Sequence, residues 1–202
     1  MNDHQNAGVK LAILGPMAGL VGVWEGNTGT DTSPGMPDQN ETDVEHGYQE
    51  RWELEHVPAG AQNHHQKLQV LTFATSAHRA SPSTAGHISG EAFHAQCGFM
   101  VWDAADKQLL ASFAVPRGIV INAGGTVEPD ATSFELVAEA GSETYGICQN
   151  PSLLENFKVV RYILKVKFND DGSIDYEQDT QLQIKGRGLM HHTDSNHLVR
   201  QS

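Results

Sequence analysis

The stretch LVGVWEGNTGTDTSP, residues 20–34, decides how the rest of the chain is interpreted. It has an alternating pattern, one tryptophan, Trp24, and three glycines, Gly22, Gly26 and Gly29. A phosphate-binding loop needs a lysine after its last glycine, and a dinucleotide-binding turn needs alternating strand and helix patterns around GxGxxG. The stretch has neither feature. It therefore predicts a β-strand in which Trp24 plugs the closed end of a barrel, while Gly26 and Gly29 allow a tight bend.

Runs with strand character recur along the rest of the chain, separated by turn residues. They cover residues 48–57, 68–80, 92–102, 108–116, 118–127, 133–140, 156–168, 173–184 and 189–200. The sequence NDDGS at 169–173 predicts a hairpin turn. About ten strands joined by short turns predict an all-β fold, an antiparallel up-and-down β-barrel, because closure removes the exposed edges of the sheet. A barrel of this kind resembles lipocalins and fatty-acid-binding proteins and leaves room for an internal cavity.

The domain organisation that we predict is simple. Residues 1–10 form a polar tail, and residues 11–202 form a single β-barrel domain. Glycine and proline within residues 11–21 favour a short helical turn before the first strand. Two segments, 33–46 and 146–155, predict longer loops, and the second contains an Asn-Pro start for a helical turn.

The composition limits the partners and the compartment. The formal net charge of −12 repels nucleic acid and anionic membrane surfaces. Cys97 and Cys148 are the only cysteines, too few for a disulfide framework, which favours a reduced, cytoplasmic setting. Cys97 lies in an alternating run and is expected to be a buried small hydrophobe. The apolar run 11–24 is too short to span a bilayer and lacks a signal-peptide cleavage site.

Four blocks of the chain resemble, in order, motifs of the nitrobindin family, a group of haem-binding β-barrels. GVWEGNTGTDTSP at 22–34 is similar to its GxWxGxGxxxxP signature, and EAFHAQCGF at 91–99 to its xHxExGY strand. FAVPRGIVINAGGTV at 113–127 is similar to the HPxGIxExxxGxV stretch. LMHHTDSNHLVR at 189–200 resembles the closing LxxHLxAxLxR strand. The blocks span nearly the whole chain, and the resemblance implies a barrel that is shaped like the fatty-acid-binding proteins and binds haem.

The resemblance implies an iron ligand on the last strand. In the family, a histidine near the start of this strand holds the haem iron, and counting three residues on from Leu189 places that role on His192. A neutral imidazole on a rigid strand can hold ferric iron and leave the opposite position open for a small ligand. Strand alternation points His191 to the other face. A shift of one residue in the alignment would exchange the two histidines, so His191 is the alternative.

Other residues follow from the same resemblance. His94 matches the histidine of the second block, which in the family lies beside the haem pocket; a polar residue at the barrel rim is the alternative. Thr30 and Thr32 follow the GxWxGxG part of the first block and are expected at the same mouth. The chain departs from the family at Gln96, where glutamate is usual, and at Asp194, where apolar or small residues are common.

The resemblance also implies a function. A ferric haem b would handle nitric oxide or peroxynitrite and isomerise peroxynitrite to nitrate, a peroxynitrite isomerase-like activity. The alternative is a haem-free carrier of a fatty acid or another small apolar molecule in the same cavity. Arg161 and Arg117 are candidates to hold the carboxylate of such a ligand. The expected partners are a small molecule and, as is plausible for this family, a second copy in a homodimer.

Overall fold

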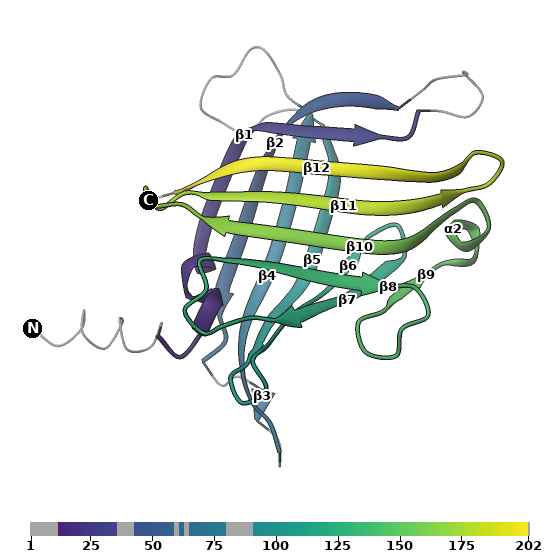
Figure 1. Cartoon of the computed structure of the whole chain (residues 1–202). Helices are drawn as coiled ribbons and strands as arrows, with labels where there is room; N and C mark the ends of the chain where they lie inside the picture. Colours follow the sequence, from purple (N-terminus) through teal and green to yellow (C-terminus); the bar gives the residue numbers. More distant parts are fainter. Residues whose placement is uncertain (1–11, 36–42, 59–60, 63–64, 80–90, 202) are drawn as a thin grey trace, which may run out of the picture.

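Ten long antiparallel strands close into a barrel in the computed structural model of the chain (Figure 1). The structure describes residues 12–35, 43–58, 61–62, 65–79 and 91–201, so the predicted polar tail lies outside it. The elements are η1 (Gly15–Leu20), β1 (Gly22–Ser33), β2 (Val44–His56), β3 (Ala61–Gln62), β4 (Lys67–Arg79), β5 (Ala92–Asp103), β6 (Gln108–Val115), β7 (Ile119–Thr126), β8 (Ser133–Glu139), β9 (Ile147–Gln149), α2 (Pro151–Asn156), β10 (Phe157–Phe168), β11 (Ile174–Ile184) and β12 (Gly188–Arg200). The predicted all-β barrel with a short N-terminal helical turn is confirmed.

The strand order follows the chain, and β1 makes the closure. It pairs with β2 on one side and with the last strand, β12, on the other, while β2 continues to β4. The wall is uneven: β10 and β11 share eleven registered residue pairs, whereas β7 and β8 share one, Gly124 with Val137. The short strand β9 pairs with the other part of β7, Ile119 to Ile121.

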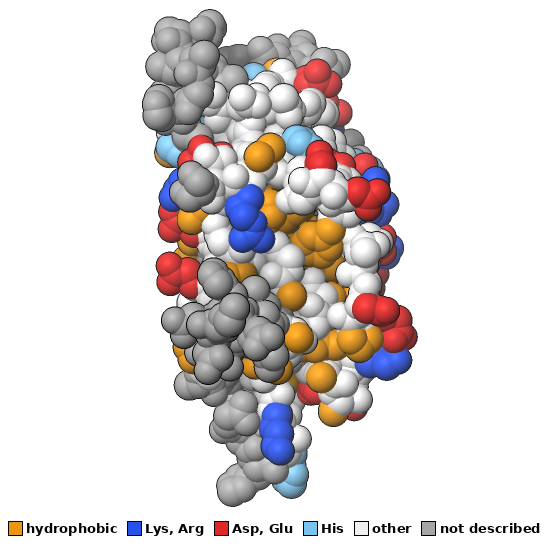
Figure 2. All heavy atoms as spheres, turned by 90° about the vertical axis from the view of Figure 1, so that its left-hand side faces the viewer, with side chains coloured by type: hydrophobic (Ala, Val, Ile, Leu, Met, Phe, Trp, Pro, Cys, Tyr) orange, Lys and Arg blue, Asp and Glu red, His pale blue; other side chains and the backbone are white. Residues whose placement is uncertain are grey.

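One end of the barrel is plugged by η1 and Trp24. Leu14, Met17 and Leu20 of this segment are buried, and the Trp24 indole, 1% exposed, donates a hydrogen bond of 2.8 Å to the Leu20 carbonyl. The predicted role of Trp24 is thereby confirmed. Figure 2, which faces the left-hand side of Figure 1, shows hydrophobic side chains in the middle of this face and Asp and Glu along its margins. The core behind the plug includes Leu54, Leu71, Met100, Trp102, Leu109, Leu136, Val159, Ile174 and Leu198.

The opening stretch forms β1, with a β-bulge where the bend was predicted. The register of β1 against β2 shifts between Gly26 and Gly29. A Cβ atom at Gly26 would lie 2.6 Å from the His197 carbonyl oxygen, so the backbones approach too closely there for a side chain. The extra residue also reverses the alternation, so that Trp24 and Asp31 both face inward.

The other strand predictions agree with the structure to within a few residues, and the NDDGS turn joins β10 to β11 as predicted. Segment 146–155 holds β9 as well as the predicted helical turn, α2, whose Leu153 amide donates to the Asn150 side chain at 3.1 Å. The end of predicted loop 33–46 is strand, because β2 begins at Val44. Cys97 is exposed rather than buried, since it faces outward. No helix among the described residues has the length and apolarity needed to cross a membrane.

Substituting Gly26→Ala tests the close approach at the bulge. The added methyl group would meet a backbone oxygen, and overpacking of this kind destabilises proteins by about 1–3 kcal/mol. The control is Thr28→Ala at an exposed position in the same bulge, expected to change stability by less than about 0.5 kcal/mol. Urea unfolding measures both. Equal midpoints for Gly26→Ala and the parent would contradict the interpretation.

Candidate functional site

A cavity of about 390 Å³ opens at the end of the barrel away from η1, a volume suited to a small molecule. One wall is apolar and comes from β6, β7, β10 and α2. It contains Phe113, Ile119, Ile121, Leu153, Phe157 and Val159. The facing wall is polar, with Asp31, Tyr48, Glu50, His94, Gln96, Gln178, His192 and Asp194. A ligand with one apolar and one polar side would match both walls.

A chain of aromatic contacts connects this cavity to the hydrophobic core. Trp52 contacts Phe73 at a centroid distance of 6.2 Å, and Phe73 contacts Phe113 at 5.9 Å. Phe113 in turn contacts Tyr162 at 5.4 Å. These edge-on contacts are worth roughly 0.5–1.5 kcal/mol each beyond burial. Trp52, Phe113 and Tyr162 of this group also line the cavity.

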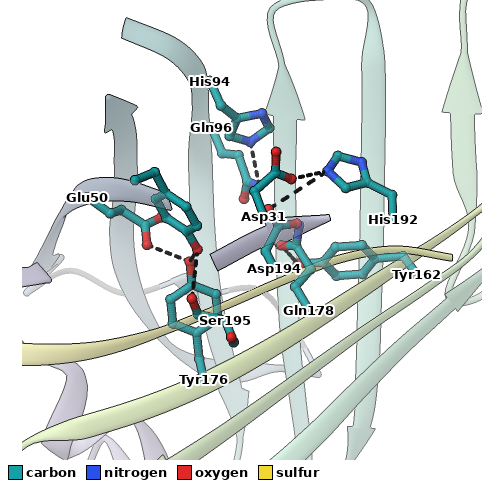
Figure 3. A network of polar contacts seen from close by, with 11 residues as sticks. Asp31, Glu50, His94, Gln96, Tyr162, Tyr176, Gln178, His192, Asp194 and Ser195 are labelled. Carbon is teal, nitrogen blue, oxygen red and sulfur yellow. Dashed lines mark hydrogen bonds and ion pairs between the residues drawn. The ribbon is translucent and has the colours of Figure 1, made fainter. Parts of the chain in front are cut away.

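His192 of β12 lies in the polar wall. The register of β12 against β11 runs without a break from Gly188 to Leu198, so alternate side chains of β12 face inward. The His192 Nε2 atom is 2.7 Å from Asp31 Oδ1 and 3.8 Å from Asp194 Oδ1 (Figure 3). His191 lines no part of the cavity and contacts Asp179 at 2.9 Å on the outer surface. The structure thus brings His192, rather than His191, into the cavity.

The pKa values of Asp31, His192 and Asp194 depend on one another. Burial alone would raise the pKa of Asp31, but the hydrogen bond and the charge of His192 more than offset it, and the pKa of Asp31 is lowered. Burial alone would lower the pKa of His192, but the hydrogen bond to Asp31 and the charges of Asp194 and Asp31 raise it. Burial raises the pKa of Asp194, and the charge of Asp31 adds to this. The Asp31 carboxylate therefore favours the protonated form of His192, while burial favours the neutral form of Asp194.

The second carboxyl group, Asp194, is held in place by hydrogen bonds from neighbouring strands. Gln178 donates to Asp194 Oδ2 at 3.0 Å, and the Tyr162 hydroxyl donates to the Gln178 amide oxygen at 2.9 Å. One ligand atom each from Asp31, His192 and Asp194 lie within 4.8 Å of one another. Among the described residues, these three side chains form the group best placed to hold a metal ion.

His94 of β5, the histidine of the second block, also faces the cavity. Its Nε2 atom lies 2.9 Å from the amide nitrogen of Gln96. Burial lowers the pKa of His94, and the charge of His192 lowers it further, so the ring is neutral at pH 7. Thr30 and Thr32 were expected at this mouth but face the outer surface, where both line a shallow depression. The bulge in β1 reverses the alternation and places Asp31 in the cavity instead.

A second polar network lies deeper and was missed by the sequence analysis. The Tyr176 hydroxyl donates to Glu50 Oε2 at 2.5 Å and lies 2.6 Å from the Tyr48 hydroxyl (Figure 3). Burial raises the pKa of Glu50 to about 7. The signal was present in the strand pattern, because Glu50 stands between Tyr48 and Trp52 at inward positions of β2.

Two arginines stand at the rim of the cavity. Arg117 follows β6, and Arg79 ends β4 with its guanidinium 5.4 Å from the Phe93 ring centroid. Neither forms a salt bridge with another residue of the described chain. Arg161, the other carboxylate-binding candidate, faces outward and contacts Glu139 at 3.6 Å. Arg117 is therefore the better candidate of the pair named from the sequence.

Comparison with known proteins identifies the family. A family model described as the THAP4-like, heme-binding beta-barrel domain matches residues 13–200. The chain belongs to this family of haem-binding barrels. The match spans the whole described barrel of this THAP4-like domain and confirms the resemblance to the nitrobindins.

A solved structure agrees with the fold of the THAP4-like barrel. The crystal structure of Rv2717c from M. tuberculosis superposes with a TM-score of 0.64 and 19% sequence identity, covering 96% of this chain and 98% of that one. At this level of identity the likeness concerns the fold. A search of curated proteins finds no match to the chain.

The cavity of the THAP4-like barrel fits a haem group in two respects. His192 presents an imidazole from the last strand, and the apolar wall offers a surface for a porphyrin. One contact limits how the iron can bind. The Nε2 atom of His192 already lies against Asp31, so this nitrogen is not free.

Substituting Glu50→Gln should change how stability depends on pH. The Glu50 carboxyl stays protonated up to a pH of about 7 in the folded protein but ionises near 4.5 in the unfolded chain. Between these values the folded state holds one more proton, so the free energy of unfolding falls as the pH rises. At about 1.4 kcal/mol per unit, the loss amounts to about 3 kcal/mol above pH 7.

The neutral glutamine side chain introduced by Glu50→Gln is not subject to this loss. Urea unfolding should therefore show the variant more stable than the parent at pH 8 and similar to it at pH 4. Glu55→Gln, an exposed change on the same strand, serves as the control and should follow the parent. A Glu50→Gln variant with the parent's slope between pH 5 and 7 would show that Glu50 ionises normally.

Proposed function

We propose that this chain binds haem b in the cavity through His192 and acts there on nitric oxide or peroxynitrite, isomerising peroxynitrite to nitrate. One observation carries the proposal. His192 is an inward-facing imidazole on the last strand, at the position that the family resemblance assigns to the iron ligand. Membership of a haem-binding family supports it.

The chain's own residues have distinct parts in this proposal. His192 would hold the iron, while Phe113, Ile119 and Ile121 would offer the porphyrin an apolar surface and keep water away. Arg79 and Arg117 stand at the rim, where guanidinium groups can pair with the propionate carboxylates. When bound, ferric haem supplies a Lewis-acidic iron with a free coordination position.

His94 is placed to contact the small ligand. It is neutral at pH 7 because burial lowers its pKa, so one ring nitrogen can donate a hydrogen bond and the other can accept one. Gln96 lies 2.9 Å from Nε2 and holds the ring in position. A donor at this point would stabilise negative charge on an oxygen atom of the ligand.

Haemin titration of the purified chain tests the proposal. We expect saturation at one haemin per chain with a histidine-ligated Soret band. His192→Ala should weaken binding by more than the roughly 10–100-fold that loss of an outer-shell partner costs, because it removes the ligand itself. The matched control is His191→Ala, which changes the adjacent outward-facing histidine and should leave the spectrum unchanged.

If the haemin-loaded spectra of both His192→Ala and His191→Ala are the same as that of the parent, the ligand assignment is wrong. Stopped-flow mixing with peroxynitrite then tests the chemistry of the loaded protein. We expect faster decay with nitrate as the product, and a decay rate equal to that of the haem-free chain would refute the activity.

A haem-free carrier is the second candidate, and Arg117 favours it. This guanidinium lines the rim beside an apolar wall and has no salt bridge within the described chain, an arrangement that suits a fatty-acid carboxylate. Native mass spectrometry of the protein as purified separates the two functions. A haem mass supports the first, and a lipid mass supports the second.

A further inference from the structure

Glu50 is a buried carboxyl group that lines the cavity. It is 5% exposed, and its Oε2 atom accepts a hydrogen bond of 2.5 Å from the Tyr176 hydroxyl (Figure 3). Burial raises its pKa to about 7, and the charge of Asp194 contributes to the increase. No salt bridge in the described part of the chain includes Glu50. Ionisation of this carboxyl group is therefore costly until a cation comes close to it.

Aromatic rings stand next to Glu50 in the cavity wall. Tyr48 and Trp52 are the neighbouring inward residues of β2, and Tyr176 comes from β11. The ring centroids of Trp52 and Tyr176 are 4.7 Å apart, and Tyr48 contacts Phe93 at 6.1 Å. Aromatic rings attract cations, more strongly where water is excluded.

The negative charge in this part of the cavity acts on other groups as well. Burial raises the pKa of Tyr48, and the charges of Glu50 and Asp194 add to this. Burial likewise raises the pKa of Tyr162, and the same two carboxyl groups contribute. The electrostatic potential here therefore favours a cationic ligand over an anionic one.

The basic side chains that line the cavity have other positions. His192 lies 2.7 Å from Asp31, and Arg79 and Arg117 stand at the rim. The Arg79 guanidinium lies 5.4 Å from the centroid of the Phe93 ring. A cation that pairs with Glu50 therefore has to come from a ligand.

We propose that the Glu50 carboxylate, together with the rings of Tyr48, Trp52 and Tyr176, binds the ammonium group of an apolar organic amine. The ammonium N–H groups would donate to the carboxylate, and the apolar wall of the cavity would cover the hydrocarbon part of the ligand. The cavity volume of about 390 Å³ leaves room for an amine such as 2-phenylethylamine. The site uses neither His192 nor a haem group, so it stands apart from the proposed function.

Isothermal titration calorimetry of the purified chain at pH 8 tests the site with three probes of similar shape. They are 2-phenylethylamine, which is a cation, 2-phenylethanol, which is neutral, and phenylacetate, which is an anion. We expect the amine to bind at least about tenfold more tightly than the alcohol, because hydrogen bonds to a charged group are stronger than those between neutral groups. Phenylacetate should bind most weakly. Equal affinities for the amine and the alcohol would refute the inference.

Substituting Glu50→Gln removes the charge and keeps the shape of the side chain. We expect it to weaken binding of 2-phenylethylamine roughly 10–100-fold. The matched control is Glu55→Gln, an exposed change on the same strand, which should bind the amine as the parent does. If Glu50→Gln also retains the parent's affinity, Glu50 does not bind the ammonium group and the inference is wrong.

Proton release gives a second measurement that needs no substitution. At pH 7 about half of the Glu50 carboxyl groups are protonated, so binding of a cation should release about half a proton per chain from this residue. Asp194, whose pKa burial also raises to about 7, adds to the release, whereas Tyr48 and Tyr176 stay neutral in this range.

Calorimetry in two buffers with different ionisation enthalpies measures this release. The affinity for 2-phenylethylamine should also rise about tenfold from pH 6 to pH 8, because Glu50 ionises over this range. Amine binding at pH 7 without any release of protons would overturn the inference even if Glu50→Gln failed to fold.

Discussion

The pairing of β1 with both β2 and β12 is the constraint on which the cavity depends. It joins the first strand to the last and so turns an open sheet into a closed wall with no free edge at this point. It also brings together side chains that are far apart in sequence. Asp31 and His192 meet across this junction, and no local segment of the chain could assemble the pair.

Closure has an electrostatic consequence. The polar wall places Asp31, Asp194 and Glu50 inside a barrel, where ionised carboxylates are poorly solvated. These three carboxyl groups are accommodated in two different ways. The His192 imidazole, whose pKa is raised, lies against Asp31 and Asp194, whereas Glu50 stays protonated up to about neutral pH beside Tyr176. One small cavity thus buries its carboxyl groups in both ways.

The sequence predicts the fold well because the strands alternate clearly and the turns carry glycine, proline or asparagine. The side that each residue faces is harder to predict. Counting alternately from Trp24 would turn Thr30 and Thr32 inward, but the bulge between Gly26 and Gly29 shifts the count by one. The last strand has no bulge between Gly188 and Leu198, so counting back from buried Leu198 correctly turns His192 inward.

The contacts within the polar wall, such as that between Asp31 and His192, could not have been predicted, because they depend on the register between strands far apart in the sequence. The strand pairing around the barrel wall is also uneven. A single rung joins β7 to β8, whereas eleven join β10 to β11. Because few hydrogen bonds have to break there, we expect the barrel wall to open first between β7 and β8. A ligand wider than the mouth would then enter most readily by separating these two strands.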